Sequence, residues 1–307
     1  MLGLLCACLA GPACHASASL DEVLTSLESG GLLSNREQAV HGGLMGILQS
    51  IDPGASLKAE GAPPAGSHTP TGAIRSVELW QEDLAYLKLD DLPPGCGPEL
   101  VTHLMALKDR AGVILDLRGV GGDGLDAVSC LAGIGHQAGD ALLVITDNRG
   151  QDPVTNSVVN ELTLGVPLMV LIDRGTHGAA EALAAVWRGC PGVMLMGSTT
   201  RGEACLRGEI TLPGGQRALV AARRLMPVHG DSYAGYGVRP TVVVAAASDV
   251  MPEPTVASGS DPERPVRPLS RKSEQDRDLM LRVAGDVVLR RATDILLGLR
   301  VVNGYGK

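Results

Sequence analysis

The residues whose types could do chemistry gather in one stretch, where an apolar run leads through a polar turn into an alanine-rich segment. Residues 168–172 predict a buried strand, residues 173–178 a turn and residues 179–188 a helix. This arrangement commonly presents a nucleophile, because the helix N-terminus beside the turn offers unpaired N–H groups to a developing anion. The nucleophile position of this turn is Gly178, which has no side chain that could react.

Other residues near this turn carry reactive groups. Thr176 and His177 adjoin Gly178, and Ser198 lies in the turn after the next strand. A hydroxyl nucleophile at Thr176 or Ser198 can be drawn with a nearby aspartate and with His177 or His229 as its base. Neighbours in a turn rarely face one another, so His177 is a poor base for Thr176. We favour the interpretation that these turn residues cap the helix and face solvent.

A serine nucleophile can also be activated by a lysine, and the positions of the lysines exclude that pairing in the centre of the chain. The chain has five lysines, and none lies between Lys108 and Lys272. A lysine base needs a lowered pKa and a place within hydrogen-bond reach of the serine. A serine in this central region would therefore have no nearby lysine in the sequence to act as its base, whichever serine is chosen.

The elements that must position the turn alternate between strand and helix patterns from residue 76 onward. Repeated β-α-β units predict an α/β fold, in which helices pack against a sheet. The predicted strands are 76–89 (two short strands, the second 85–89), 113–117, 141–146, 168–172, 193–196, 205–212, 217–222 and 238–245. The predicted helices between them are 97–109, 125–134 and 179–188.

Changes in composition divide the chain into six predicted segments. Before the core, apolar residues recur at helical spacing in two series, with a Gly-Gly break before Leu44. The segments are a signal peptide (1–18), a helical region (19–52), a linker (53–75), the core (76–250), a Pro-rich linker (251–270) and a C-terminal helix with a solvated charged face (271–307). We therefore expect an exported protein, periplasmic or extracellular.

Composition and charge limit the function further. The net charge of −8 argues against nucleic-acid binding, and no internal apolar run is long enough to span a bilayer. Four cysteines lie outside the predicted signal peptide, and their spacing fits no zinc site. We expect them to be small buried residues, with one or two disulfides as the alternative. They are Cys96, Cys130, Cys190 and Cys205.

Several blocks resemble the C-terminal processing peptidases, also called tail-specific proteases. Residues 112–127, GVILDLRGVGGDGLDA, are similar to that family's G-x-I-x-D-L-R-x-N-P-G-G-x-L-D-A block, and residues 167–181 are similar to its P-x-x-V-L-V-N-x-x-S-A-S-A-S-E block. Residues 212–219 and 235–243 resemble two later blocks in the same order. The resemblance implies a crotonase-like α/β core with an N-terminal helical segment. The family's PDZ domain has no room between Asp52 and Val77.

The resemblance also locates the family's catalytic set, which is a serine, a lysine and a glutamine. The matching positions here are Gly178, Glu203 and Arg207. We expect these three residues to converge on one cleft. The backbone N–H groups that form the family's anion hole correspond to Gly122 and Ala179.

Two hypotheses follow from these departures. The first is a catalytically inactive relative that uses the cleft to bind peptides, with peptide or protein C-termini as candidate ligands. The alternative is an active serine-type peptidase with a relocated nucleophile at Thr176 or Ser198. Both hypotheses imply no cofactor and no metal, and neither fixes the oligomeric state.

Overall fold

The structure, a computed structural model, describes residues 19–59, 61, 72–80, 84–147, 153–213, 215–244, 283 and 285–303. The chain forms two compact units, Met1–Leu57 and Lys58–Lys307. The predicted signal peptide (1–18), the Pro-rich linker (251–270) and residues 60 and 62–71 of the predicted linker 53–75 lie outside the described residues. None of the described helices is both long and apolar enough to cross a membrane.

The first unit consists of two helices, α1 (Leu20–Ser29) and α2 (Arg36–Ile51), followed by the two-residue strand β1 (Ser56–Leu57). Ser19 begins α1 with a capping box, in which its side chain and that of Glu22 each accept a backbone N–H. The helices are separated at Gly30 and Gly31, where Gly31 has a positive φ, whereas α2 continues through Gly42 and Gly43.

The core of the second unit is a six-stranded sheet in the order β11-β8-β7-β4-β3-β2, parallel except for the edge strand β2. The central strands β4 and β7 are buried along their whole length, which explains their continuous apolar sequences. The strands are β2 (Ile74–Leu79), β3 (Leu84–Leu89), β4 (Gly112–Asp116), β7 (Leu168–Ile172), β8 (Val193–Gly197) and β11 (Val242–Val243). The α/β prediction is confirmed.

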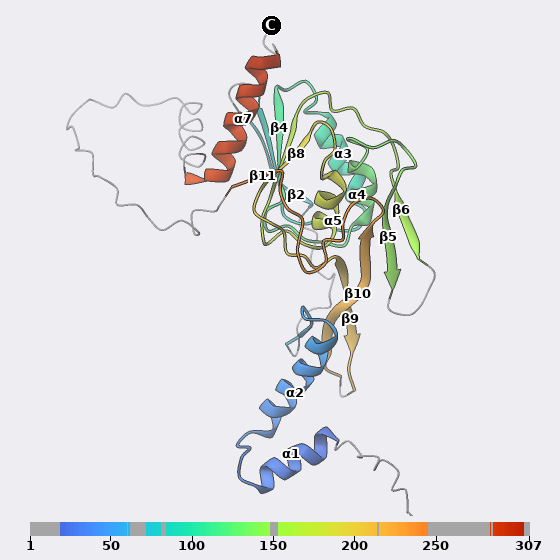
Figure 1. Cartoon of the computed structure of the whole chain (residues 1–307), viewed down its shortest axis with the longest axis vertical. Helices are drawn as coiled ribbons and strands as arrows, with labels where there is room; N and C mark the ends of the chain where they lie inside the picture. The colour runs from blue at the N-terminus through green and yellow to red at the C-terminus, as the bar shows by residue number, and fades with distance from the viewer. Residues whose placement is uncertain are drawn as a thin grey trace, which may run out of the picture. The chain divides into compact units, whose positions relative to one another are not determined.

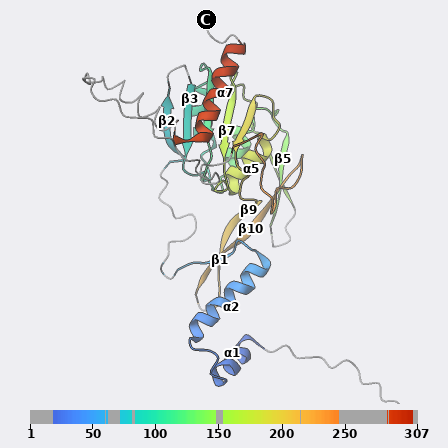
Figure 2. The same ribbon diagram turned by 60° about the vertical axis from the view of Figure 1, so that its left-hand side comes forward.

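Helices cover both faces of this sheet (Figures 1 and 2). On one face α3 (Gly97–Met105), α4 (Leu125–Leu131) and α5 (Gly178–Trp187) pack over alternate residues of the strands. On the other face α7 (Val287–Asn303) packs against the remaining residues through Val288, Leu289, Ala292 and Leu296. The Leu296 side chain approaches to 3.0 Å from where a Cβ on Gly112 would lie, so a glycine in β4 makes room for the helix.

A second, antiparallel sheet places β10 between β9 and β5, and β6 beyond β5. Its strands are β5 (Ala141–Asp147), β6 (Val154–Ser157), β9 (Cys205–Thr211) and β10 (Arg217–Pro227). Among the described strands of this unit, β9 pairs with β10.

Several predicted boundaries were wrong. The predicted strand 238–245 shortens to two residues, the predicted helix 97–109 ends at Met105, and β10 runs five residues past the predicted 222, to Pro227. The strand at 141–146 exists, but it belongs to the antiparallel sheet. β6 was not predicted at all.

Candidate functional site

A groove of about 470 Å³ opens at the carboxyl ends of the parallel strands. Because parallel strands end at the same edge of a sheet, the segments that follow β3, β4, β7 and β8 meet there. One wall is the glycine-rich turn 119–123 together with the N-terminus of α5. The other wall is formed by five consecutive residues of β9, 205–209, and by Leu219 of β10.

Gly178 is the first residue of α5 and has a φ of +56°, a left-handed conformation that favours glycine. A Cβ at this position would overlap the backbone carbonyl oxygen of Gly122. The amide of Ala179 donates to the same oxygen at 2.9 Å. The nucleophile position therefore carries no side chain and has no space for one in this structure.

One of the two N–H groups of the predicted anion hole at Gly122 and Ala179 has a partner within the protein. The Ala179 N–H is bonded to the Gly122 carbonyl, so it does not project unpaired into the groove. Gly122 itself has a φ of +94°, a left-handed conformation that favours glycine. One of the amides in the first turn of α5 is therefore bonded within the protein.

Glu181, one turn into α5, fixes the loop that follows β8. Its fully buried carboxylate accepts hydrogen bonds from the Thr200 hydroxyl and from the amides of residues 202–204, at 2.5 to 3.5 Å. Burial raises the pKa of Glu181 and the four donors oppose this, with a net shift upward. Ala204 has a φ of +46°, so the loop is held in a strained conformation directly after Glu203.

The same loop places Glu203 in the groove beside Arg207. The Arg207 Nε atom lies 3.4 Å from one carboxylate oxygen of Glu203, and the Arg201 guanidinium lies 3.3 Å from the other. Gly178, Glu203 and Arg207 all line this groove, as the order of the sequence blocks predicts. The residues at the family's lysine and glutamine positions thus form an ion pair.

The alternative nucleophiles lie elsewhere. Thr176 is fully buried, and its hydroxyl donates to the Leu117 carbonyl at 2.8 Å, so it supports the turn from inside the core. Ser198 is half-buried and is not part of the groove lining. His177 lines the groove, with Nδ1 at 2.8 Å from the Gly175 carbonyl oxygen, whereas His229 is exposed and lies at a different pocket.

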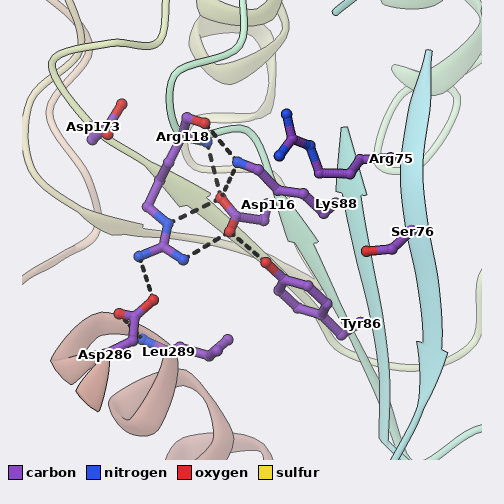
Figure 3. Close-up of a pocket in the computed structure, with 9 residues that line it drawn as sticks. All are labelled: Arg75, Ser76, Tyr86, Lys88, Asp116, Arg118, Asp173, Asp286 and Leu289. Carbon is purple, nitrogen blue, oxygen red and sulfur yellow. Dashed lines mark hydrogen bonds and ion pairs between the residues drawn. The ribbon is translucent and has the colours of Figure 1, made fainter. Parts of the chain in front are cut away.

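A second pocket, of about 400 Å³, contains a network of charged side chains centred on Asp116 (Figure 3). Asp116 is almost fully buried at the end of β4, where it accepts two hydrogen bonds from the Arg118 guanidinium and one from the Tyr86 hydroxyl. The Lys88 ammonium lies 3.3 Å away. Burial raises the pKa of Asp116, but the hydrogen bonds and charge of Arg118, with Lys88 and Tyr86, bring it below its usual value.

The Asp116 network reaches the last helix. The remaining Nη1 of Arg118 binds Asp286 at 2.7 Å, and the other carboxylate oxygen of Asp286 accepts the Leu289 amide at 3.0 Å. Asp286 therefore caps α7 and ties it to the segment that leads into the groove turn. The predicted solvated face of the C-terminal helix is wrong for this residue, because its carboxylate is ion-paired with Arg118.

A comparison of the sequence with known protein families agrees with the fold described above. The profile of peptidase family S41 matches residues 83–244, more than half of the 307-residue chain. This chain belongs to peptidase family S41.

Relatives of this S41 member are C-terminal processing peptidases. It is 30% identical to the chloroplastic C-terminal processing peptidase of Tetradesmus obliquus over 43% of this chain and 28% of that one. It is 28% identical to the carboxyl-terminal-processing protease of Picosynechococcus over 49% of this chain and 36% of that one. The chain thus spans about a third of the length of the curated relatives it matches.

Solved structures agree in fold. A candidate peptidase from Parabacteroides merdae has a TM-score of 0.54 at 18% identity, covering 76% of this chain and 84% of that one. A lipoprotein from Streptococcus agalactiae has a TM-score of 0.50 at 16% identity, covering 74% of this chain and 85% of that one. At these identities the likeness concerns the fold alone.

Several acidic residues that line the groove were not predicted from the sequence. Asp90 and Asp91 line it directly after β3, and Asp123 and Glu209 complete its acidic lining. Asp90 and Asp91 follow an apolar strand, and that position at the carboxyl edge of a parallel sheet was the available signal. The four described cysteines are free, and in the described part of the chain no three His, Cys, Asp or Glu side chains form a metal site.

Proposed function

We propose that this S41 member is a degenerate relative of the processing peptidases that binds extended peptide segments in the groove without hydrolysing them. The observation that carries the proposal is the Gly122 carbonyl oxygen. It occupies the space that a Gly178 side chain would need, and it takes the amide of Ala179. A peptidase of this kind needs a nucleophile at the first position and a free donor for the oxyanion at the second.

The charges opposite Gly178 support the same proposal. Glu203 presents a carboxylate where a general base of the Ser–Lys type would need a neutral amine. Two arginines hold that carboxylate, and Glu203 and Arg207 are both largely buried. An ion-paired carboxylate does not supply the neutral amine that such a mechanism requires.

The shape of the groove favours a peptide in extended conformation. Five consecutive residues of β9 form one wall, so an extended segment of this chain lines the groove along its length.

Binding of a short, unstructured, fluorescently labelled peptide, followed by anisotropy, tests the proposal. Leu219→Trp places a large ring in the groove and should abolish binding. Val154→Trp, an exposed strand position outside the groove, should leave binding unchanged. Equal binding by both tryptophan variants would refute the groove as the site.

The alternative, an active serine-type peptidase, would give a different result in this experiment. An active enzyme would shorten the peptide, so the anisotropy would fall with time. We expect a stable signal, since the hydroxyl of Thr176 is bonded in the core and Ser198 lies outside the groove lining.

A further inference from the structure

The pocket centred on Asp116 is separate from the groove, with which it shares none of its described lining residues. Its volume of about 400 Å³ is in the range of small-molecule sites. Its polar side chains come from β2, β3, the end of β4 and the segment that precedes α7 (Figure 3). The charged residues of its lining are three cations and three carboxylates: Arg75, Lys88, Arg118, Asp116, Asp173 and Asp286.

Two of the three carboxylates are engaged by donors of the protein itself. Asp116 accepts hydrogen bonds from the amide and the guanidinium of Arg118 and from the Tyr86 hydroxyl. One oxygen of Asp173 accepts the amides of residues 119, 175 and 176, at 2.9 to 3.1 Å. These two carboxylates hold the walls of the pocket in place.

The cations on the β2 and β3 side of the pocket keep donors for a ligand. The Lys88 ammonium has three N–H donors, and it contacts two acceptors, the Arg118 carbonyl oxygen at 2.6 Å and an Asp116 oxygen at 3.3 Å. Arg75 pairs with Asp90 through Nε, so its two terminal nitrogens have no partner among the described residues, and 65% of its side chain is exposed. An anion at this side of the pocket would meet donors of both side chains.

The other side of the pocket already holds a carboxylate from a distant part of the chain. Nη1 of Arg118 lies 2.7 Å from an Asp286 oxygen. The same guanidinium donates through Nε and Nη2 to Asp116, which is 1% exposed, so it is held in place for a carboxylate at Nη1. The pair of Asp286 with Arg118 remains partly exposed, at 24% and 21%, so a ligand can exchange with it at small cost.

We infer that this pocket binds a small dicarboxylate, one carboxylate of which replaces Asp286 on Arg118. The other carboxylate meets the donors of Lys88 and Arg75. Binding frees Asp286 from its ion pair but leaves its bond to the Leu289 amide, so α7 keeps its N-cap. The site is independent of peptide binding in the groove.

Isothermal titration calorimetry with succinate, at constant ionic strength, tests this site. Succinate should bind about tenfold more tightly than monomethyl succinate, because the ester lacks one of the two carboxylates. Succinamide has the same carbon chain without charge and should not bind.

Variants of this chain locate the bound succinate. Asp286→Asn removes the competing charge and keeps a side chain that can cap α7, so it should raise the affinity about fivefold. Asp294→Asn makes the same change of net charge at an exposed position of α7 outside the pocket, and it should leave the affinity unchanged. Arg75→Gln, at a largely exposed side chain, should lower the affinity. Thermal melts show whether each variant is folded.

Three results would overturn the inference. Equal affinity of the wild type and Asp286→Asn for succinate would mean that Asp286 does not occupy the ligand's place. Equal gains from Asp286→Asn and Asp294→Asn would mean that the gain arises from net charge. The third is the absence of succinate binding to both the wild type and Asp286→Asn.

Discussion

The amide of Ala179 donates to the carbonyl oxygen of Gly122, joining the first turn of α5 to the glycine-rich turn after β4. The same oxygen lies where a Gly178 side chain would be. The lack of space at Gly178 and the engagement of the Ala179 amide therefore depend on the same oxygen. A side chain at Gly178 would require this oxygen to move.

Rebuilding the family's catalytic set is expected to fail for this reason. Gly178→Ser with Glu203→Lys and Arg207→Gln should lower the free energy of unfolding by about 1–3 kcal/mol, because the new Cβ meets the Gly122 carbonyl at a left-handed φ. We expect no peptidase activity. Gly178→Ala is the matched control for the added Cβ, and thermal melts compare the variants. A stable triple variant that cleaves peptide would show that the turn reorganises readily.

Glu181 should be required for the groove wall that carries Glu203. Glu181→Gln presents an amide NH₂ to backbone N–H donors and leaves at least one of them unsatisfied, so we expect a loss of about 1–3 kcal/mol. Hydrogen exchange should accelerate at residues 200–204. Glu99→Gln, at an exposed glutamate of α3, is the control. Unchanged exchange in this loop would mean that the carboxylate does not hold it.

The Asp116 network makes a pH-dependent contribution to stability. Because Arg118 and Lys88 keep the folded-state pKa of Asp116 below its usual value, its contribution is complete above about pH 4. It is lost as the pH falls through the folded-state value. Asp116→Asn should cost roughly 3 kcal/mol at neutral pH, and the gap to the wild type should narrow in acid. Melts from neutral pH downward measure this gap.

The control for that pH series is Asp109→Asn, which removes an exposed carboxylate. Its melting temperature should follow that of the wild type at every pH. A constant gap between Asp116→Asn and the wild type at all pH values would contradict the account, because the contribution would then not depend on ionisation.

The packing of α7 should be an integral part of the second unit. Leu296→Ala, at a fully buried position against β4, should cost about 2–5 kcal/mol. Val302→Ala on the same helix, where the residue is 82% exposed, should change stability by less than about 0.5 kcal/mol. Equal stability of the two variants in denaturant titrations would mean that α7 does not pack as described.

The features that could be predicted from the sequence are those carried by local pattern. The run Leu168–Ile172 is buried on both faces, so its apolar sequence matches the observed strand residue for residue. The position of Gly178 and the meeting of Glu203 with Arg207 followed from the order of the family's blocks. β6 was missed because Val154–Ser157 is short and mostly polar, and its pairing with β5 stabilises it.

Other features depend on conformation or on distant contacts. The hydrogen bond from the Ala179 amide to the Gly122 carbonyl joins two turns far apart in the sequence, so no local pattern could predict it. The link between Arg118 and Asp286 likewise joins residues far apart in the sequence.

The proposed function requires that the groove binds a peptide and does not cleave it. The most direct measurement is mass spectrometry of an unstructured peptide and of the protein after long incubation together at near-equal concentrations. We expect one peptide species of unchanged mass and a protein without an acyl adduct. This result is expected under conditions in which anisotropy shows saturable binding. A peptide with a new terminus, or an adduct mapped to Thr176, Ser198 or any other residue of the groove, would contradict it.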